Sequence, residues 1–383
     1  MRNVENEQKR SYPINKSEKK GMVLKMQKKY KVGLIGLGGI AKGAHMSAYG
    51  RMDNVELAAI CDILPSKIEA FKERYHLPED FPAFTDYHDL LEMEGLDYVD
   101  ICTPNYLHSI IAVDALNKGL NVFTEKPDAV SVKEVTRMKE AADASGKVLM
   151  AMRNNRHRNT AKFLKNYIAD GNMGDIYCGR CGWIRRRGIP GKGGWFTTKE
   201  QSGGGPLIDL GVHMIDLAIW LMGNPTPVAV SGCTYTKFAD TEVSDSINSF
   251  FGDKKANGIF DVEDLAMGFI RFDSGACLQI EFSWASNIKE EDNFVELRGT
   301  KSGAKISMQK GLEIFSESYG QLTDIAPRVD DLKGIPQHEA NLRHFLDVLG
   351  GAKPDFVPVQ GVNMIKILEA MYQSAALGRE IQL

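Results

Sequence analysis

The chain has 383 residues, of which 43% are hydrophobic and 25% are charged, and its formal net charge is −3. This length and composition predict a globular protein of two domains with a sizeable core. The small net charge provides no overall field that would attract nucleic acid or an anionic membrane. We find no apolar run of membrane-spanning length and no apolar signal segment near the N-terminus, so we expect a cytoplasmic protein.

The first 29 residues are polar, rich in lysine and without apolar periodicity. Such a segment cannot bury enough apolar surface to fold, so residues 1–29 are predicted to be a disordered tail. A basic arm that binds nucleic acid is the alternative, but aromatic side chains are not interleaved with its charges. Order is expected to begin at about residue 30.

A short apolar strand beginning at Lys31 leads into Gly36-x-Gly38-x-x-Ala41 and then into a helical stretch. This order is typical of the turn that binds the pyrophosphate of a dinucleotide at a helix N-terminus. The next apolar strand ends at Asp62, where a carboxylate can accept hydrogen bonds from ribose hydroxyls and repel a 2′-phosphate. The pattern therefore predicts NAD rather than NADP, although Lys67 lies close by.

Strands and helices alternate as far as residue 152, which predicts a parallel, doubly wound sheet of the Rossmann type. Further strands are expected at 55–62, 96–102, 120–124 and 147–152. Helices are expected at 65–75, 86–93, 106–118 and 132–144. Ligands bind beyond the carboxyl ends of such strands, and polar motifs stand at each of these ends. One of them contains Lys126, which is either a surface lysine or a cation that lowers the pKa of a substrate hydroxyl.

Three glycines and a proline precede an apolar helical pattern that runs from Leu207 to about residue 222. Asp209 and His213 are i and i+4 on this helix and share one face, with Asp216 close to that face. A carboxylate beside an imidazole, just after a glycine-rich break, can place a proton-transfer group at a cleft. A capped core helix with a satisfied histidine is the alternative, and a metal site on the same face would lack a second His or Cys.

Two other features of the second half have competing interpretations. Cys178 and Cys181 have CxxC spacing but lie in a strand-like run, where positions i and i+3 face opposite ways, so neither a metal site nor a disulfide is expected. The segment from 183 to 197 contains three consecutive arginines, 185 to 187, and Trp195. These can grip a polyhydroxylated or phosphorylated ligand and stack on a sugar face, or they can be a solvated charge run and an interface aromatic.

From about residue 30 to the C-terminus, the chain resembles the glucose–fructose oxidoreductase, inositol dehydrogenase and MocA family (Gfo/Idh/MocA). The motifs that carry the resemblance are G-L-G-G-I-A at 36–41, T-P-N at 103–105, E-K-P at 125–127, N-N-R at 154–156 and G-G-G-P-L-I-D-L-G-V-H-M-I-D-L at 203–217. It implies a Rossmann domain, residues 30–152, and a C-terminal α/β domain, residues 153–383, with a large, open, mainly antiparallel sheet. His157 departs from the family, in which many members carry an aromatic residue there.

The resemblance also implies the roles of individual residues. Lys126, Asp209 and His213 form the catalytic group, and the bond between Lys126 and Pro127 can be cis. The residues assigned to cofactor binding are Gly36, Gly38, Gly39, Ile40, Ala41, Asp62, Thr103, Asn105, His108, Glu125, Lys126 and Asn154. The residues assigned to the substrate are Arg156, Arg186, Trp195, Asp209 and His213.

The sequence therefore predicts an NAD(H)-dependent oxidoreductase that acts on a secondary hydroxyl of a sugar, glycoside or cyclitol. A non-catalytic NAD-binding regulator on the same fold is the alternative. The remaining strands are expected at 228–236, 263–272, 276–285 and 293–299, and closing helices at 337–349 and 362–377. The open face of their sheet is expected to join subunits into a homodimer or homotetramer. The expected ligand is a small sugar or polyol, and no nucleic acid, membrane or metal is expected to bind.

Overall fold

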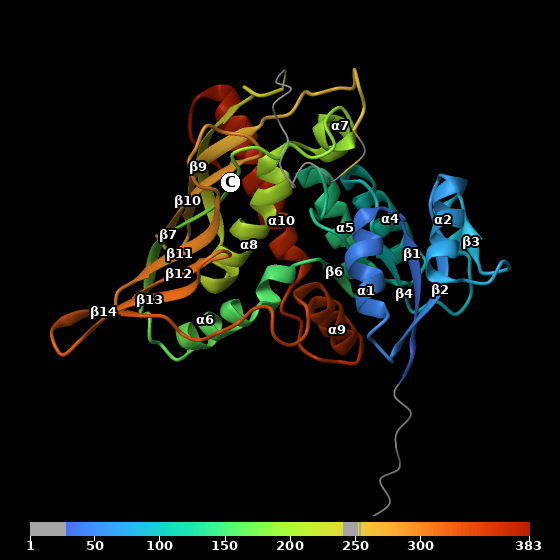
Figure 1. The fold of residues 1–383 in the computed structure, drawn as a ribbon, viewed down its shortest axis with the longest axis horizontal. Helices are drawn as coiled ribbons and strands as arrows, with labels where there is room; N and C mark the ends of the chain where they lie inside the picture. The colour runs from blue at the N-terminus through green and yellow to red at the C-terminus, as the bar shows by residue number, and fades with distance from the viewer. Residues whose placement is uncertain (1–27, 240–251, 253) are drawn as a thin grey trace, which may run out of the picture.

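A computed structural model of the protein describes residues 28–239, 252 and 254–383 (Figure 1). Nearly all of the expected N-terminal tail, residues 1–27, lies outside the described residues. The described chain contains two sheets, one of six strands and one of nine. Figure 1 shows these sheets at opposite ends of the molecule, with helices between them.

The six-stranded sheet has the order β3-β2-β1-β4-β5-β6, and every neighbouring pair in it is parallel. Its strands are β1 (Tyr30–Ile35), β2 (Val55–Cys61), β3 (Ala83–Phe84), β4 (Tyr98–Ile101), β5 (Asn121–Thr124) and β6 (Leu149–Ala151). Its helices are α1 (Met46–Tyr49), α2 (Pro65–Tyr75), α3 (Tyr87–Leu91), α4 (Asn105–Asn117) and α5 (Val132–Ser145), and a π-helical turn (Ala41–His45) precedes α1. The predicted doubly wound parallel sheet is confirmed.

The local sequence explains where these elements begin and end. All four residues of β4 are buried, as expected of a parallel strand covered by helices on both faces. The side chain of Ser131 caps α5 by accepting a hydrogen bond from the N–H of Glu134, and Gly146 ends that helix in a left-handed conformation. Signals of this kind fix where α5 begins and ends.

The nine-stranded sheet has the order β14-β13-β12-β11-β7-β10-β9-β8-β15. Its strands are β7 (Ile176–Ile184), β8 (Pro227–Tyr235), β9 (Leu265–Phe272), β10 (Cys277–Ser283), β11 (Asp292–Gly299), β12 (Gly303–Ser307), β13 (Gly311–Ser318), β14 (Gln321–Ile325) and β15 (Ile381–Gln382). Among its described pairs, β7 and β10 are parallel and the others are antiparallel. The carboxyl ends of β7 and β10 therefore lie at the same edge of the sheet.

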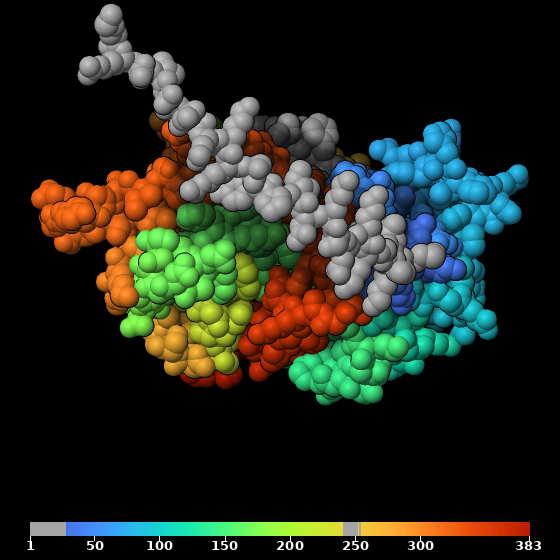
Figure 2. Space-filling view, turned by 90° about the horizontal axis from the view of Figure 1, so that it is seen from below, coloured from blue at the N-terminus to red at the C-terminus, as the bar shows by residue number. Residues whose placement is uncertain are grey.

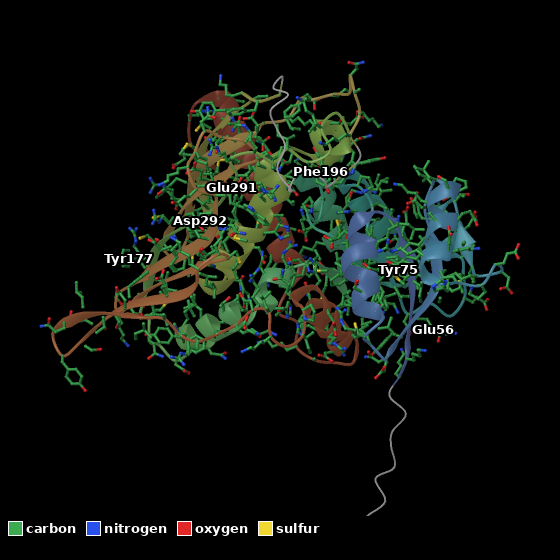
Figure 3. All side chains as sticks on the ribbon, in the orientation of Figure 1. Glu56, Tyr75, Tyr177, Phe196, Glu291 and Asp292 are labelled. Atoms are coloured by element: carbon green, nitrogen blue, oxygen red, sulfur yellow. The ribbon has the colours of Figure 1, made fainter. Side chains whose placement is uncertain are left out.

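Helices α6 (Asn159–Ala169), α8 (Val212–Leu221) and α10 (Pro358–Leu377) cover one face of this sheet, and a π-helical turn (Leu207–Gly211) leads into α8. The other helices of the second half are α7 (Lys199–Ser202), which lies beside α4, and α9 (Gln337–Leu349), which packs against the N-terminal unit. On the other face, Tyr177 and Tyr235 are 54% and 45% exposed. Figure 3 shows Tyr177 on the side of the sheet that faces away from the helices. The sheet is therefore open on one side, as the sequence predicted.

The C-terminal region returns to the first sheet. The ring of Phe345 in α9 packs edge-on against Tyr98 of β4 and is tilted against Phe123 of β5, with ring centroids 5.1 Å and 5.2 Å apart. Glu339 of α9 pairs with Arg51 at 2.5 Å. Figure 2 shows this C-terminal segment between the N-terminal unit and the rest of the second half. The core of the N-terminal unit thus includes side chains from a helix that follows residue 152.

One helical stretch corrects the expectation that no run of membrane-spanning length exists. Lys199–Leu221 is long and apolar enough to cross a membrane, with a mean hydropathy of 1.3 over its most apolar window. However, 78% of that window is buried inside the chain, which is typical of a core helix. This stretch contains the predicted helix of Asp209 and His213, so that helix is anchored in the core by its apolar residues.

Candidate active site

The glycine-rich turn after β1 has the geometry that a dinucleotide requires. Gly36 has φ +92°, and a Cβ there would lie 2.7 Å from the backbone carbonyl of Cys102. In contrast, a Cβ on Gly38 or Gly39 would meet no atom of the described chain within 4 Å, which leaves their backbone open to a ligand. Ile40 is 38% exposed and Ala41 is buried, as expected of the fingerprint.

Asp62 is held beside this turn. Its two carboxylate oxygens accept hydrogen bonds from the backbone N–H groups of Leu37 and Leu64, both at 3.0 Å. The side chain is partly exposed at the end of β2, so its remaining lone pairs can accept from ribose hydroxyls. The turn and Asp62 together fit the adenosine and pyrophosphate parts of NAD.

The other predicted cofactor residues differ in how they are bonded. Within the described residues, the buried Oγ1 of Thr103 and Oδ1 of Asn154 have no hydrogen-bond partner, so both are available to a polar ligand. Asn105 instead donates to the carbonyl of Ser202 at 2.8 Å. His108 is buried with its ring nitrogens 2.7 Å and 2.9 Å from the carbonyls of Pro127 and Thr103, and burial lowers its pKa. Asn105 and His108 therefore tie loops together at this position.

Lys126 and Asp209, from different halves of the chain, form an ion pair. The Nζ of Lys126 donates to the Oδ1 of Asp209 at 2.8 Å and to its backbone carbonyl at 3.0 Å. The Nε1 of Trp284 donates to the other carboxylate oxygen at 3.0 Å. Burial alone would raise the pKa of Asp209, but the charges of Lys126 and Arg185 outweigh it and lower that pKa. The peptide bond between Lys126 and Pro127 is cis.

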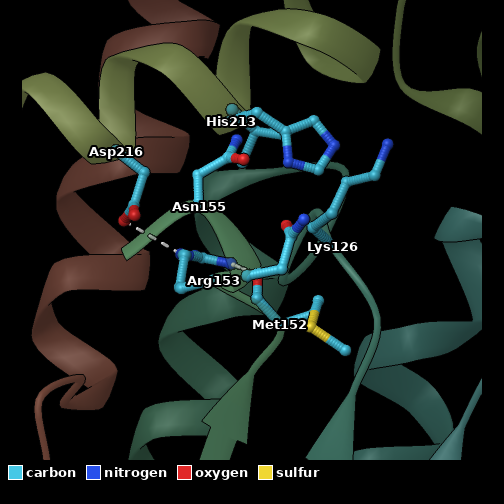
Figure 4. Close-up of a pocket in the computed structure, with 8 residues that line it drawn as sticks. Lys126, Met152, Arg153, Asn155, His213 and Asp216 are labelled. Carbon is cyan, nitrogen blue, oxygen red and sulfur yellow. Dashed lines mark hydrogen bonds and ion pairs between the residues drawn. The ribbon is translucent and has the colours of Figure 1, made fainter. Parts of the chain in front are cut away.

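His213 faces the same shallow depression as Lys126 (Figure 4), which is also lined by Asn154 and Asn155. In the part of the chain that the structure describes, its ring nitrogens have no hydrogen-bond partner. Burial and then the Lys126 ammonium lower the pKa of His213 to about 3, although Asp209 and Glu125 oppose this. The imidazole is therefore neutral near pH 7, and its ring nitrogens are open to a ligand.

Glu125 lies beneath this site in a buried network rather than in the open cleft. Its Oε1 is 2.8 Å from the Nε2 of His45, and its Oε2 accepts from the backbone N–H of Lys126 at 3.1 Å. The Nδ1 of His45 is 2.6 Å from Asp100. Burial disfavours a charge on His45, but Asp100 raises its pKa well above the usual value, and the pKa of Glu125 falls to about 2. The network thus holds the Lys126 backbone through an ionised Glu125.

The same network contains a group of possible metal ligands. Donor atoms of His45, Asp100 and Cys102 lie within 4.8 Å of one another. Both ring nitrogens of His45 are already engaged by carboxylates, and Tyr49 also donates to Asp100 at 2.5 Å. These contacts describe a hydrogen-bonded core cluster.

Arg156 and Asp216 are bound to each other, although Asp216 also lines the depression that Lys126 and His213 share. Arg156 is 2% exposed and donates to both carboxylate oxygens of Asp216, at 2.8 Å and 2.6 Å. Asp216 also accepts from the Nε of Arg153 at 3.0 Å. Arg156 lines a separate groove of about 390 Å³ with Trp220 and His344. The predicted contact of Arg156 with substrate does not fit this position, and Asp216 is occupied by arginines rather than free for a metal.

The segment after β7 contains Arg186 and Trp195, which are assigned to the substrate from the sequence. Arg186 is exposed, and its backbone N–H donates to Glu291 at 2.7 Å. Trp195 stacks on Phe196 with ring centroids 3.8 Å apart. The side chain near the catalytic group is Arg185, which is only 6% exposed and whose pKa burial lowers.

Sequence reasoning missed several residues around the site: His45, Trp183, Trp284 and His338. Trp183 is the penultimate residue of β7, with its ring 6.0 Å from that of His213, and Trp284 follows β10. Had the parallel pairing of these two strands been recognised, it would have placed both tryptophans at one edge. His338 lies at the start of α9, where burial lowers its pKa, Glu125 raises it and Lys126 lowers it.

Comparison with known proteins shows which family the sequences of both halves match. Residues 30–152 match the GFO_IDH_MocA oxidoreductase family with an NAD-binding Rossmann fold, and residues 162–305 match the GFO/IDH/MocA C-terminal domain. D-Glucoside 3-dehydrogenase of Escherichia coli (strain K12) is 32% identical over 358 residues, which cover 92% of this chain and 97% of that protein.

Two further relatives extend the comparison. The scyllo-inositol 2-dehydrogenase (NADP(+)) of Bacillus subtilis (strain 168) is 26% identical over 366 residues, which cover 92% of this chain and 96% of that protein. A levoglucosan dehydrogenase solved with NADH and levoglucosan has a TM-score of 0.80 at 23% identity, covering 93% of this chain and 99% of that one. Both halves of the chain thus match in sequence and in fold, and the protein belongs to the Gfo/Idh/MocA family of oxidoreductases, with an NAD-binding Rossmann domain.

Proposed function

We propose that the protein oxidises a secondary hydroxyl of a sugar, glycoside or cyclitol with NAD, or reduces the corresponding keto compound. The relatives named for glucosides and inositols support this substrate class. The observation that carries the proposal is the Lys126–Asp209 ion pair of 2.8 Å beside a neutral, unbonded His213. A cation and a proton acceptor at one depression are what removal of a hydroxyl proton requires.

NAD, when bound, supplies the acceptor of the hydride. The Gly36–Ala41 turn and Asp62 hold its pyrophosphate and ribose, and the unpartnered oxygens of Thr103 and Asn154 bind polar groups nearer the reacting carbon. His213 accepts the hydroxyl proton at a ring nitrogen. The Lys126 ammonium stabilises the negative charge that develops on the substrate oxygen, while Asp209 fixes the position of Lys126.

The preference for NAD over NADP belongs to the same proposal. Asp62 places a carboxylate where the 2′-phosphate of NADP would lie, and two like charges there repel. A relative named for NADP shows that the family includes both preferences, so Asp62 is the residue expected to decide between them.

A non-catalytic NAD-binding regulator could share the fold. Such a protein would need neither the cation nor the proton acceptor, whereas this chain brings Lys126, Asp209 and His213 together from both halves. The ion pair therefore favours an enzyme.

We further propose that residues 153–383 form the substrate-binding and oligomerisation domain, that the open face carrying Tyr177 and Tyr235 joins two or four copies, and that the protein is cytoplasmic.

The test is a screen of glucosides, inositols and monosaccharides for reduction of NAD by the wild-type protein, followed by two variants. We expect His213→Ala to lower kcat by roughly 10²–10⁴-fold, with NAD binding unchanged. Lys126→Ala should be comparably damaging and non-additive with it, because both act on one proton transfer. The matched controls His88→Ala, at an exposed residue, and Lys139→Ala, at a half-exposed one, should retain activity. Near-normal turnover by His213→Ala would contradict the mechanism.

A further inference from the structure

Arg185 is a buried cation with unused hydrogen-bond donors. It is 6% exposed, its Nε has no hydrogen-bond partner among the described residues, and its Nη1 donates to the carbonyl of Gly188 at a long 3.3 Å. A guanidinium carries five N–H donors, and burying it without partners is costly. Buried polar groups are normally satisfied, so the missing partner is expected to be a ligand.

The position of Arg185 points to the substrate. Arg185 directly follows β7, and its guanidinium lies over the ring of Trp183 at 5.0 Å. That ring is 6.0 Å from His213, which faces the depression shared with Lys126. The glycine turn that fits the pyrophosphate of NAD is on the other sheet, after β1. Arg185 therefore approaches the reacting centre from the second half of the chain.

The nearby carboxylate does not satisfy Arg185. Asp209 attracts it electrostatically, but the Asp209 oxygens are bonded to Lys126 and Trp284. Arg187, two residues later, has more hydrogen bonds than Arg185. Its guanidinium donates to the carbonyls of Arg186 and Ser286 and to Asn287. Within the described residues, Arg185 thus combines deep burial with incomplete hydrogen bonding.

We infer that Arg185 is a substrate-binding residue that donates hydrogen bonds to the oxygens next to the carbon that is oxidised. A planar fork of N–H donors suits two adjacent oxygens, such as the reacting hydroxyl of a sugar ring and the hydroxyl on the neighbouring carbon. The inference rests on the proposed function and adds to it a requirement for a vicinal hydroxyl. A site with unpaired donors rejects an analogue that lacks the matching oxygen.

The experiment takes carbon 3 of the sugar as the reacting carbon, as named for the Escherichia coli relative. It compares Arg185→Met and Arg185→Lys with the wild-type enzyme on methyl β-D-glucopyranoside and on its 2-deoxy and 4-deoxy analogues, each of which lacks one hydroxyl next to carbon 3. We expect Arg185→Met to lose roughly 10-fold to 100-fold in kcat/KM on the parent glucoside. It should lose far less on the deoxy analogue that lacks its partner oxygen. Arg185→Lys should not restore the parent rate, because an ammonium cannot donate as a fork. Arg137→Met, which removes an exposed arginine of α5, is the matched control.

An equal loss on all three glucosides would overturn the inference, because it would indicate a purely structural role. Binding measured by calorimetry with NADH separates this inference from the proposed function. If the wild type binds the glucoside without oxidising it, the proposed function fails and the role of Arg185 is judged from binding alone. In that case, loss of glucoside binding by Arg185→Met would support the role of Arg185, and retained binding would overturn it. Absence of glucoside binding to the wild type would also overturn the role of Arg185. Preference for methyl β-D-glucuronide that disappears in Arg185→Met would mean that Arg185 binds a carboxylate, which contradicts the vicinal-hydroxyl assignment.

Discussion

The pKa of His213 can be tested without knowing the substrate. Burial lowers it most, the Lys126 ammonium lowers it further, and Asp209 and Glu125 oppose them, which leaves a pKa of about 3. A neighbouring like charge commonly moves a pKa by about 1–3. We therefore expect Lys126→Met to raise the pKa of His213 to between roughly 4 and 6. The ordinary value of 6.5 is not restored, because the ring stays buried.

The assay is an NMR titration of the protein with ¹³C-labelled histidine, with His213→Gln used to assign the resonance. In the wild type, the His213 signal should not move between about pH 5 and 8, since a group of pKa about 3 is roughly 1% protonated at pH 5. In Lys126→Met, the chemical shift of the His213 signal should begin to change at the acidic end of this pH range. Asp209→Asn should not raise the pKa, because it removes a charge that favours the imidazolium.

A wild-type His213 that titrates near pH 6.5 would refute this reasoning, because it would mean that the site is hydrated and that Lys126 does not act on the ring. Stability gives a second check with a definite sign. The unfolded chain binds a proton at His213 below about pH 6.5, whereas the folded chain does not until about pH 3. The free energy of unfolding therefore decreases as the pH falls from 6.5, by at most about 2 kcal/mol at pH 5. In His213→Asn, the decrease in this free energy over the same pH range should be smaller by that amount.

Three further predictions concern the cofactor site, the buried network and the N-terminus. Asp62→Ala should weaken NAD binding by roughly 10-fold to 100-fold in a fluorescence titration, since charge-assisted hydrogen bonds are lost; tighter binding of NADP than of NAD by the wild type would contradict the role of Asp62. His45→Gln should lower the free energy of unfolding in urea by about 3–5 kcal/mol, because Asp100 and Glu125 lose their buried cation, and the exposed His88→Gln should not. Removal of residues 1–25 should leave Tm unchanged in calorimetry, and a fall of several degrees would show that they pack on the fold.

The position of the cofactor site could be predicted because parallel topology converts sequence order into geometry. Once strands and helices alternate, every strand ends at the same edge, so Asp62, Thr103, Lys126 and Asn154 had to gather there. The i, i+4 spacing of Asp209 and His213 likewise placed both on one face of a helix. These inferences needed the backbone alone, and the Lys126–Asp209 contact of 2.8 Å agrees with them.

The hydrogen-bond partners could not be predicted, because periodicity identifies buried positions but not the side chains that meet there. Glu125 was expected in the cleft, yet it turns inward to His45, far away in sequence. Arg156 was expected at the substrate, yet Asp216 holds it at 2.6 Å and 2.8 Å. Strands β12 to β14 were also missed, although Ile306, Leu312 and Ile314 are buried; the exposed Tyr319 and Leu322 remove the apolar face only at the far end of the β13–β14 hairpin.

The arrangement of charges supports the proposed action of Lys126 on a substrate. Glu125 is the carboxylate nearest to it in sequence and could neutralise the ammonium directly. However, His45 engages one oxygen of Glu125, and the Lys126 backbone engages the other. Lys126 instead pairs with Asp209, whose second oxygen is held by Trp284 at 3.0 Å. The ammonium is thus fixed by a single carboxylate oxygen and a carbonyl, which leaves one of its three donors for a developing alkoxide beside His213.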